Sequence, residues 1–300
     1  MAFKRWVRTP WILASFQLAV LFVPFAPVEA QAQRSFLWKV ESKMSTVYIL
    51  GSVHFLKKEN YPLTARIEEA FQRSSALVVE ANINDLGKLD PQRLLSGAFY
   101  GDDDSMDRHL SPEVVQLVKK ETGDLGIPIE LVNRQKPWFL AITLEALELM
   151  KSGYDPQYGI DLHFLNKARP EKRILELESL DDQLRLLSNL SDRDQELFLL
   201  LTLTDLRNLG EQADRMVKAW ADGEPERLES IITKSVREEP RLRPVFEKLI
   251  DERNRKMVVK IEEYLKTGES YFVVVGAGHL VGNKGIIEIL KNKGYTVEQL

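Results

Sequence analysis

The fold is decided by the stretch Thr46-Val47-Tyr48-Ile49-Leu50-Gly51-Ser52-Val53-His54, an apolar, β-branched run that leads through a glycine to a histidine. The pattern recurs near the other end of the chain, where Tyr271-Phe272-Val273-Val274-Val275 leads into Gly276-Ala277-Gly278-His279. Such short apolar runs are typical of strands that are buried on both faces of a sheet. Both histidines are therefore expected just past the carboxyl end of a strand, the edge where open α/β sheets bind their ligands.

Two further apolar runs end in a carboxylate. Residues 76–80 end at Glu80, and residues 173–178 end at Glu178. Helical spacing of apolar residues predicts an amphipathic helix over residues 62–71, between the strand that leads to His54 and the strand that ends at Glu80. Strand, helix, strand is a βαβ unit, so the two strands are predicted to be parallel and to present His54 and Glu80 at the same edge.

The whole pattern predicts an α/β protein, with a parallel-rich mixed sheet flanked by helices and an inserted helical region at about residues 180–250. Additional strands are expected at residues 36–40 and 295–299. Helical periodicity dominates residues 86–168, and the last helices are predicted at residues 242–266 and 284–293. The recurrence of strand-Gly-x-x-His indicates two related halves of the sheet. Residues 31–300 are thus expected to form one α/β domain.

The composition narrows the possible functions. The chain has 300 residues, of which 44% are hydrophobic and 29% charged, with a net charge of −4. This is an ordinary globular composition, and its acidic balance argues against a nucleic-acid partner. The chain contains no cysteine. Disulfides, thiol catalysis and thiolate metal sites are therefore excluded, and a metal would need histidine and carboxylate ligands.

The first thirty residues have a different character. Three basic residues precede the apolar stretch 11–25, and small residues follow at Ala30 and Ala32. A basic region, a short apolar region and a small-x-small site predict a signal peptide over residues 1–30, cleaved after Ala30 or Ala32. The alternative is a retained membrane anchor, but the apolar stretch is short for a span and is interrupted by Gln17 and Pro24. The mature protein is therefore expected to be periplasmic or secreted, without a membrane span.

His54, His279 and Glu80 form the first candidate site. Two imidazoles and a carboxylate match the ligand set of a catalytic Zn²⁺, Mn²⁺ or Co²⁺ ion that keeps one position open for water. Such a metal lowers the pKa of its bound water and polarises a carbonyl group. The same residues also suit a metal-free mechanism, in which His54 is a general base oriented by Glu80 and His279 stabilises the developing charge. The residue types serve both mechanisms equally well.

The motifs as a set resemble the TraB/GumN family of bacterial proteins, also called the TraB/PrgY/GumN family. The resemblance covers about residues 35–300. Besides Glu80, the matching stretches in chain order are Gly51-Ser52-Val53-His54, Tyr158-Gly159-Ile160-Asp161, Leu177-Glu178-Ser179 with Gln183, Glu252-Arg253-Asn254, and Gly276-Ala277-Gly278-His279-Leu280.

This resemblance implies a relation to the Wnt-cleaving membrane metalloproteases of animals and to the erythromycin esterases. It implies a metal and catalytic centre at His54, Glu80 and His279, with Arg253 as a substrate or oxyanion contact. Three further candidates for the site are implied by their place in the motifs: Asp161, Glu178 and Asn254. The esterase branch looks similar in its motifs but uses histidine and glutamate as acid and base, so both mechanisms remain open.

Two functional hypotheses follow. The first is an exported, metal-dependent hydrolase that cleaves a peptide or ester bond in a peptide or small-molecule substrate. The alternative is a non-catalytic periplasmic protein that binds or quenches a peptide signal or another small ligand. A binding protein would tolerate the loss of a water-activating residue such as Glu80 if its fold survived, whereas a hydrolase would not.

Overall fold

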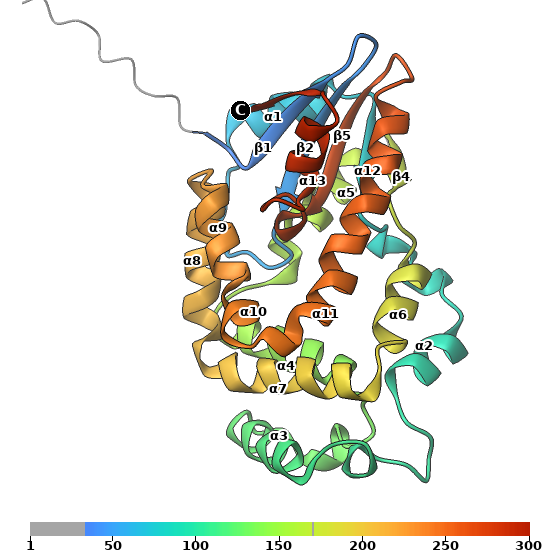
Figure 1. Cartoon of the computed structure of the whole chain (residues 1–300), viewed down its shortest axis with the longest axis vertical. Coiled ribbons are helices and arrows are strands. Elements are labelled where there is room, and N and C mark those ends of the chain that lie inside the picture. The colour runs from blue at the N-terminus through green and yellow to red at the C-terminus, as the bar shows by residue number, and fades with distance from the viewer. Residues whose placement is uncertain (1–33, 170) are drawn as a thin grey trace, which may run out of the picture. The chain divides into compact units, whose positions relative to one another are not determined.

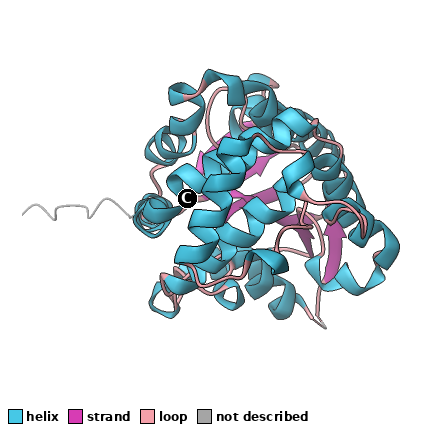
Figure 2. Cartoon of the chain, turned by 90° about the horizontal axis from the view of Figure 1, so that it is seen from below, coloured by secondary structure: helices cyan, strands magenta, loops and turns pink. Residues whose placement is uncertain are grey.

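The computed structural model describes residues 34–169 and 171–300, which form a six-stranded sheet with helices on both faces (Figures 1 and 2). The predicted signal peptide lies outside the described residues. The strand order is β4-β3-β5-β2-β1-β6. The strands are β1 (Leu37–Glu41), β2 (Thr46–Ser52), β3 (Ala76–Val79), β4 (Arg173–Glu176), β5 (Ser270–Gly276) and β6 (Thr296–Gln299).

The centre of the sheet is parallel. β5 pairs in parallel with β2 on one side and with β3 on the other, and β3 pairs in parallel with β4, whereas β1 pairs antiparallel with β2 and β6. The predicted parallel-rich mixed sheet is thus confirmed. β2 and β3 run parallel as predicted, but they are not neighbours, because β5 lies between them. Nearly all side chains of these three strands are buried, which is why their sequences are apolar without alternation.

Helices cover both faces of the sheet (Figures 1 and 2). α1 (Ala65–Arg73) and α5 (Ile160–Ala168) pack on one face, and α12 (Glu252–Tyr264) and α13 (Ile286–Asn292) pack on the other. Aromatic rings join the first pair to the sheet, since Phe164 lies 5.0 Å from Phe71 and 4.8 Å from Phe272 between ring centroids. Large rings of this kind contribute much of the buried apolar area of a core.

A helical layer lies beyond the carboxyl ends of the parallel strands (Figure 1). It has its own apolar core, to which Val118, Leu140, Leu199 and Leu203 contribute. The segment predicted as a helical insertion supplies the second half of this layer. The helices are α2 (Pro91–Ala98), α3 (Pro112–Asp124), α4 (Pro137–Lys151), α6 (Leu180–Ser188), α7 (Asp192–Asp205), α8 (Leu209–Ala221), α9 (Pro225–Ile232), α10 (Lys234–Glu238) and α11 (Arg243–Phe246). None of the described helices is long and apolar enough to cross a membrane.

Gly51 marks a place where chain segments crowd together at the end of β2. Its carbonyl accepts a hydrogen bond of 2.7 Å from the indole nitrogen of Trp220, which ties the sheet to α8. A Cβ atom at this position would collide with the ring of Phe36 and lie 3.2 Å from the Cα of Ala277. The close approach of these segments therefore requires a residue without a side chain.

We expect Gly51→Ala to lower the free energy of unfolding by about 1–3 kcal/mol, because the added methyl group overpacks a closed part of the core. Urea unfolding of the purified protein measures this loss. Gly101→Ala is the matched control, since a Cβ atom there meets nothing within 4 Å. Equal stability of the two variants would show that the Phe36 ring can move aside at no cost.

Candidate active site

His54 forms an ion pair with Asp161 at the carboxyl end of β2. Its Nδ1 atom lies 2.7 Å from Oδ2 of Asp161, which stands in the first turn of α5. The His54 side chain is 65% exposed, whereas that of Asp161 is 11% exposed. The nearby carboxylate raises the pKa of His54 to about 9. His54 is therefore an imidazolium at neutral pH, with its ring open to solvent.

Local backbone contacts bring Asp161 to His54. The Ile160 N–H donates to the carbonyl of Val53 at 3.1 Å, and a Cβ atom at Gly159 would collide with the His54 carbonyl. Only a glycine lets the two segments approach so closely. The prediction that Glu80 orients His54 is wrong, because Asp161 makes that contact. The reason is the strand order: Glu80 follows β3, and β5 separates β3 from the strand that carries His54.

Glu80 and Glu178 lie side by side at the ends of β3 and β4. The sheet ladder continues past both strands, since the Glu178 N–H donates to the Glu80 carbonyl at 2.8 Å. Arg253 binds both side chains: its Nε donates to the Glu178 carboxylate at 2.9 and 3.1 Å, and its Nη2 pairs with Oε1 of Glu80. All three side chains are at most 14% exposed. This is a buried, charge-assisted network of one guanidinium and two carboxylates.

The remaining acceptor sites of Glu80 are also used. Gln183 donates its side-chain amide to Oε1 at 2.9 Å, and the Gly276 N–H donates to Oε2 at 3.0 Å. Burial opposes the ionisation of Glu80, but the charges of His279, Arg253 and His54 outweigh it and lower the pKa of Glu80 to about 2. Because Arg253 is permanently charged, Glu80 stays ionised through the neutral pH range.

A π-helical segment places Arg253 in this network. α11 passes through a π-helix at Glu247–Asp251 and then into α12, where the sequence alone predicts one continuous helix. Single π-helical turns inside α-helices occur frequently at functional sites. The Nη1 atom of Arg253 donates to the Leu249 carbonyl at 3.0 Å, so the π-helical segment also supplies a hydrogen bond to the guanidinium. Lys284 pairs with Asp251 at 2.7 Å and holds the segment against the loop after β5.

His279 is held in one tautomer by Asn254. The Asn254 Nδ2 donates to the Lys284 carbonyl at 2.8 Å, so its Oδ1 faces Nδ1 of His279, at 2.7 Å. The proton must therefore sit on Nδ1 of His279, which leaves the Nε2 lone pair free, 3.9 Å from Oε2 of Glu80. The His279 side chain is only 5% exposed, and burial lowers its pKa to about 4. His279 is neutral at neutral pH.

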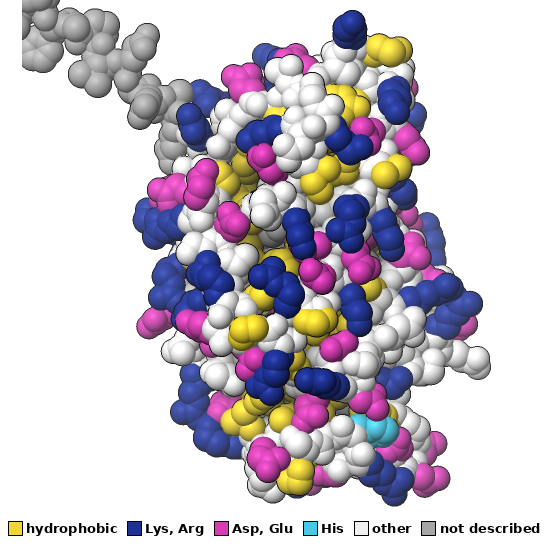
Figure 3. Space-filling model, in the orientation of Figure 1, with side chains coloured by type: hydrophobic (Ala, Val, Ile, Leu, Met, Phe, Trp, Pro, Cys, Tyr) yellow, Lys and Arg dark blue, Asp and Glu magenta, His cyan; other side chains and the backbone are white. Residues whose placement is uncertain are grey.

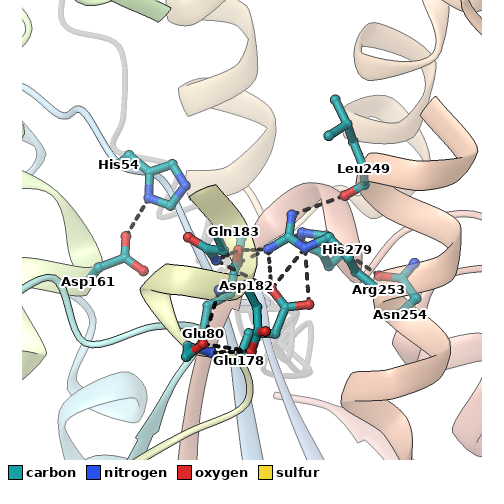
Figure 4. Close-up of polar contacts among 12 residues, drawn as sticks. His54, Glu80, Asp161, Glu178, Asp182, Gln183, Leu249, Arg253, Asn254 and His279 are labelled. Atoms are coloured by element: carbon teal, nitrogen blue, oxygen red, sulfur yellow. Dashed lines mark hydrogen bonds and ion pairs between the residues drawn. The ribbon is translucent and has the colours of Figure 1, made fainter. Parts of the chain in front are cut away.

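The site thus has two halves, which Figure 4 shows together. His54 and Asp161 form one half, and the network around Glu80 forms the other. Among the described residues, no hydrogen bond or ion pair joins the two halves. Every candidate predicted from the sequence belongs to one of them: His54, Glu80, Asp161, Glu178, Arg253, Asn254 and His279.

Two functional contacts were not predicted. Ser52 donates its hydroxyl to the same Asp161 oxygen that His54 contacts, and Gln183 bridges Glu80 and Glu178. Both residues lie within the motifs quoted above. The sequence feature that could have identified Gln183 is the capping box formed by Ser179 and Asp182 directly after Glu178. It predicts the start of α6 and so places Gln183 in the first turn of this helix.

His54, Glu80 and His279, in the arrangement that the structure shows, do not form a three-ligand metal site. Both imidazoles have a free Nε2 atom, but Glu80 already accepts bonds from Arg253, Gln183 and the Gly276 N–H. A catalytic zinc ion takes three protein ligands. In residues 34–169 and 171–300, no group of three histidine or acidic side chains is arranged to hold a metal ion. The metal centre stays a prediction.

The fold and the site define an α/β protein with a cluster of histidine, carboxylate and arginine side chains at the carboxyl ends of its parallel strands. The chain belongs to the TraB/PrgY/gumN family, whose sequence profile matches residues 36–299. It is 25% identical over 245 residues to the uncharacterized protein YbaP of Escherichia coli K12, a match that covers 81% of this chain and 87% of YbaP. An uncharacterized protein of Treponema pallidum is 21% identical over 274 residues, covering 85% of this chain and 80% of that protein.

Metalloproteases match a much shorter stretch. The metalloprotease TIKI2 of Danio rerio is 37% identical over 54 residues, which is 17% of this chain and 10% of TIKI2. The TIKI homolog of Amphimedon queenslandica is 39% identical over 54 residues, or 17% of this chain and 11% of that protein. No solved structure matches the chain at a significant level.

We expect Arg253→Met to lower the free energy of unfolding by about 3–5 kcal/mol at pH 7, because it leaves Glu80 and Glu178 buried without a counter-charge. Urea unfolding measures the loss. Arg255→Met, a change on the exposed side of the same helix, is the matched control and should alter stability by no more than about 0.5 kcal/mol. A stable Arg253→Met protein would mean that the two carboxylates share a proton or reach solvent.

Proposed function

We propose that this protein is a hydrolase that cleaves a peptide or ester bond, with His54 and His279 as its two proton-transfer groups. The observation that carries the proposal is the difference in surroundings between the two histidines: Nδ1 of the exposed His54 lies 2.7 Å from the Asp161 carboxylate, whereas Nδ1 of the buried His279 lies 2.7 Å from the neutral Asn254 amide. The first setting raises the pKa of its histidine and the second lowers it. Pairs of titratable groups whose environments push their pKa values apart are typical of acid–base catalysis. Family membership and the local likeness to metalloproteases support hydrolysis as the reaction.

In this mechanism, His279 is the general base. Its free Nε2 accepts a proton from the attacking water, and the imidazolium that forms lies beside the ionised Glu80, which stabilises it. His54 is the general acid, and its imidazolium donates a proton to the leaving group. Asp161 and Asn254 fix the two rings. These roles differ from the metal-free mechanism expected from the sequence, in which His54 was the general base and His279 stabilised the developing charge.

Arg253 has a positioning role in this proposal. Its guanidinium is occupied by Glu80, Glu178 and the Leu249 carbonyl, so it orients the carboxylate that faces His279. The predicted oxyanion contact would require one of these bonds to open.

Export also remains part of the proposal, on the strength of the pattern in residues 1–30. The substrate is a peptide or a small ester.

We expect His279→Ala and His54→Ala each to lower kcat at least about 100-fold, since each removes one proton-transfer group. p-Nitrophenyl acetate and unfolded casein are suitable first substrates for residues 33–300. His109→Ala is the matched control, because His109 pairs with Asp104 outside the site. Folded wild-type protein that turns over neither substrate, or His279→Ala protein with full activity, would contradict the proposal. A folded wild-type protein that turns over neither substrate is the result expected for a binding protein.

The rate should also depend on pH in a defined way. His279 must be neutral to act as the base, so kcat/KM is expected to rise as the pH passes about 4. His54 must be protonated to act as the acid, so kcat/KM is expected to fall as the pH passes about 9. The alkaline limb should disappear in His54→Ala. An alkaline limb that survives in this variant would assign it to another group.

Metal content separates this mechanism from the metal-dependent one. After incubation with Mn²⁺, Co²⁺ or Zn²⁺ and desalting, we expect far less than one metal ion per chain, and no loss of activity in EDTA, because Glu80 is held by Arg253. Elemental analysis of the wild type beside the His54→Ala, His279→Ala double variant measures this. Near-stoichiometric metal in the wild type that disappears in the double variant would contradict the metal-free mechanism. It would instead support a water activated by a bound metal, and only the assignment as a hydrolase would remain.

A further inference from the structure

Lys284 bonds to both ends of the π-helical segment Glu247–Asp251. Its Nζ atom lies 2.7 Å from Oδ2 of Asp251, the last residue of the segment, and 3.3 Å from Oε1 of Glu247, the first residue. π-Helical turns are rare in proteins, so this one needs support from its surroundings. A single ammonium group that binds the first and the last residue holds the turn closed from outside.

The pair of Lys284 with Asp251 differs from an ordinary surface ion pair. Figure 3 shows basic and acidic side chains intermingled on the face of the molecule that α12 and α13 cover. The pair of Lys291 with Glu288 on α13 is an ordinary one, because its side chains are 50% and 42% exposed, and such pairs contribute little to stability. The Asp251 side chain is only 5% exposed, so its charge depends on Lys284 for compensation.

The π-helical segment decides which way Asn254 points. Each residue of an α-helix turns the chain by about 100°, and a π-helical turn holds one residue more than an α-helical turn. Asn254 follows the segment in α12, so the direction of its side chain depends on whether the extra residue is kept in the turn. In the observed register, Oδ1 of Asn254 lies 2.7 Å from Nδ1 of His279. Relaxation of the segment into a regular α-helix would turn Asn254 away from His279.

The backbone of Lys284 fixes the same amide. Its carbonyl accepts a hydrogen bond of 2.8 Å from Nδ2 of Asn254. A carbonyl group can only accept, so the amide oxygen of Asn254 has to face His279. The chain that joins His279 to Lys284 is closely folded, since a Cβ atom at Gly285 would lie 2.4 Å from the carbonyl oxygen of Val281. Lys284 therefore belongs to the same compact loop as His279, and it contacts Asn254 and the π-helical segment at once.

We propose that Lys284 is a positioning residue that sets the tautomer of His279 through Asn254. A neutral histidine in water carries its proton mainly on Nε2, and in a protein the hydrogen bond made by one ring nitrogen decides where the proton sits. The ammonium group of Lys284 keeps the register of α12, and its carbonyl orients the Asn254 amide. The proton of His279 is thereby held on Nδ1. This effect on the tautomer needs no reaction, whereas its effect on a rate rests on the proposed function.

The test compares Lys284→Met, which removes the charge but keeps a long side chain, with Lys284→Arg, which keeps the charge. Lys291→Met is the matched control, because it removes the charge of an exposed pair that does not touch the π-helical segment. Long-range ¹H–¹⁵N NMR spectra of histidine-labelled protein at neutral pH report the tautomer of each ring. The chain has four histidines, and the spectrum of His279→Ala identifies the signals of His279. Turnover of p-nitrophenyl acetate is measured on the same proteins.

In the wild type, Lys284→Arg and Lys291→Met, His279 is expected to carry its proton on Nδ1. In Lys284→Met we expect mainly the Nε2–H tautomer and a kcat lowered about tenfold or more with KM unchanged, because the base is no longer aligned with the water. A folded Lys284→Met protein that keeps the Nδ1–H tautomer overturns the proposal, and so does an Nε2–H tautomer in the wild type. Wild-type protein with the expected tautomer but no ester turnover contradicts the hydrolase instead and leaves the role of Lys284 in place.

The double variant Asp251→Asn, Lys284→Met provides a second test, in case Lys284→Met fails to fold as judged by circular dichroism. It removes both charges of the pair, so no buried carboxylate is left without compensation. We expect this variant to fold but still to show the Nε2–H tautomer of His279, because nothing clamps the π-helical segment. If Lys284 served only to stabilise the fold, the double variant would regain the Nδ1–H tautomer, and that result overturns the proposal.

Discussion

The structure of the site depends on the burial of Arg253 between two glutamates. Burying a carboxylate costs several kcal/mol unless it is paired and hydrogen-bonded. Here Glu80 and Glu178 follow adjacent parallel strands, so the sheet brings two like charges together at its edge. One guanidinium from α12 compensates both, and the π-helical segment before it supplies a further acceptor at Leu249. This network connects the end of the sheet with the helix that also carries Asn254.

The same network sets the chemistry of His279. A neutral imidazole with a free lone pair is useful only if its tautomer is fixed and a negative charge stands ready to stabilise its protonated form. Asn254 provides the first condition through Nδ1, and Glu80 provides the second at 3.9 Å from Nε2. Arg253 keeps Glu80 ionised and in place, and in the proposed mechanism it acts on the reaction only through this carboxylate. This role becomes visible only in the contacts of the guanidinium, all of which are with protein groups: Glu80, Glu178 and the Leu249 carbonyl.

The sequence predicts the sheet and part of the site, for physical reasons. Runs such as Val273-Val274-Val275 have to be buried strands, and parallel strands end at the same edge, so His54, Glu80 and His279 could be located without a structure. Asp161 and Arg253 could not be derived in this way. They lie on helices whose approach to the sheet edge depends on tertiary packing. The family resemblance pointed to them because they belong to its motifs, but it could not show which histidine each one serves.

The two copies of the strand-Gly-x-x-His motif place their histidines in different surroundings. β2 and β5 are adjacent, with Ser52 opposite Gly276, so both strand-Gly-x-x-His turns leave the sheet side by side. After β5, the chain enters a short 3-10 helix that packs against α9 and the π-helical segment, and the burial of His279 there lowers its pKa. After β2, the chain runs outwards beside α5, which leaves His54 exposed next to Asp161 and raises its pKa. A repeated sequence thus yields two histidines whose pKa values are shifted in opposite directions, because the two turns meet different parts of the chain.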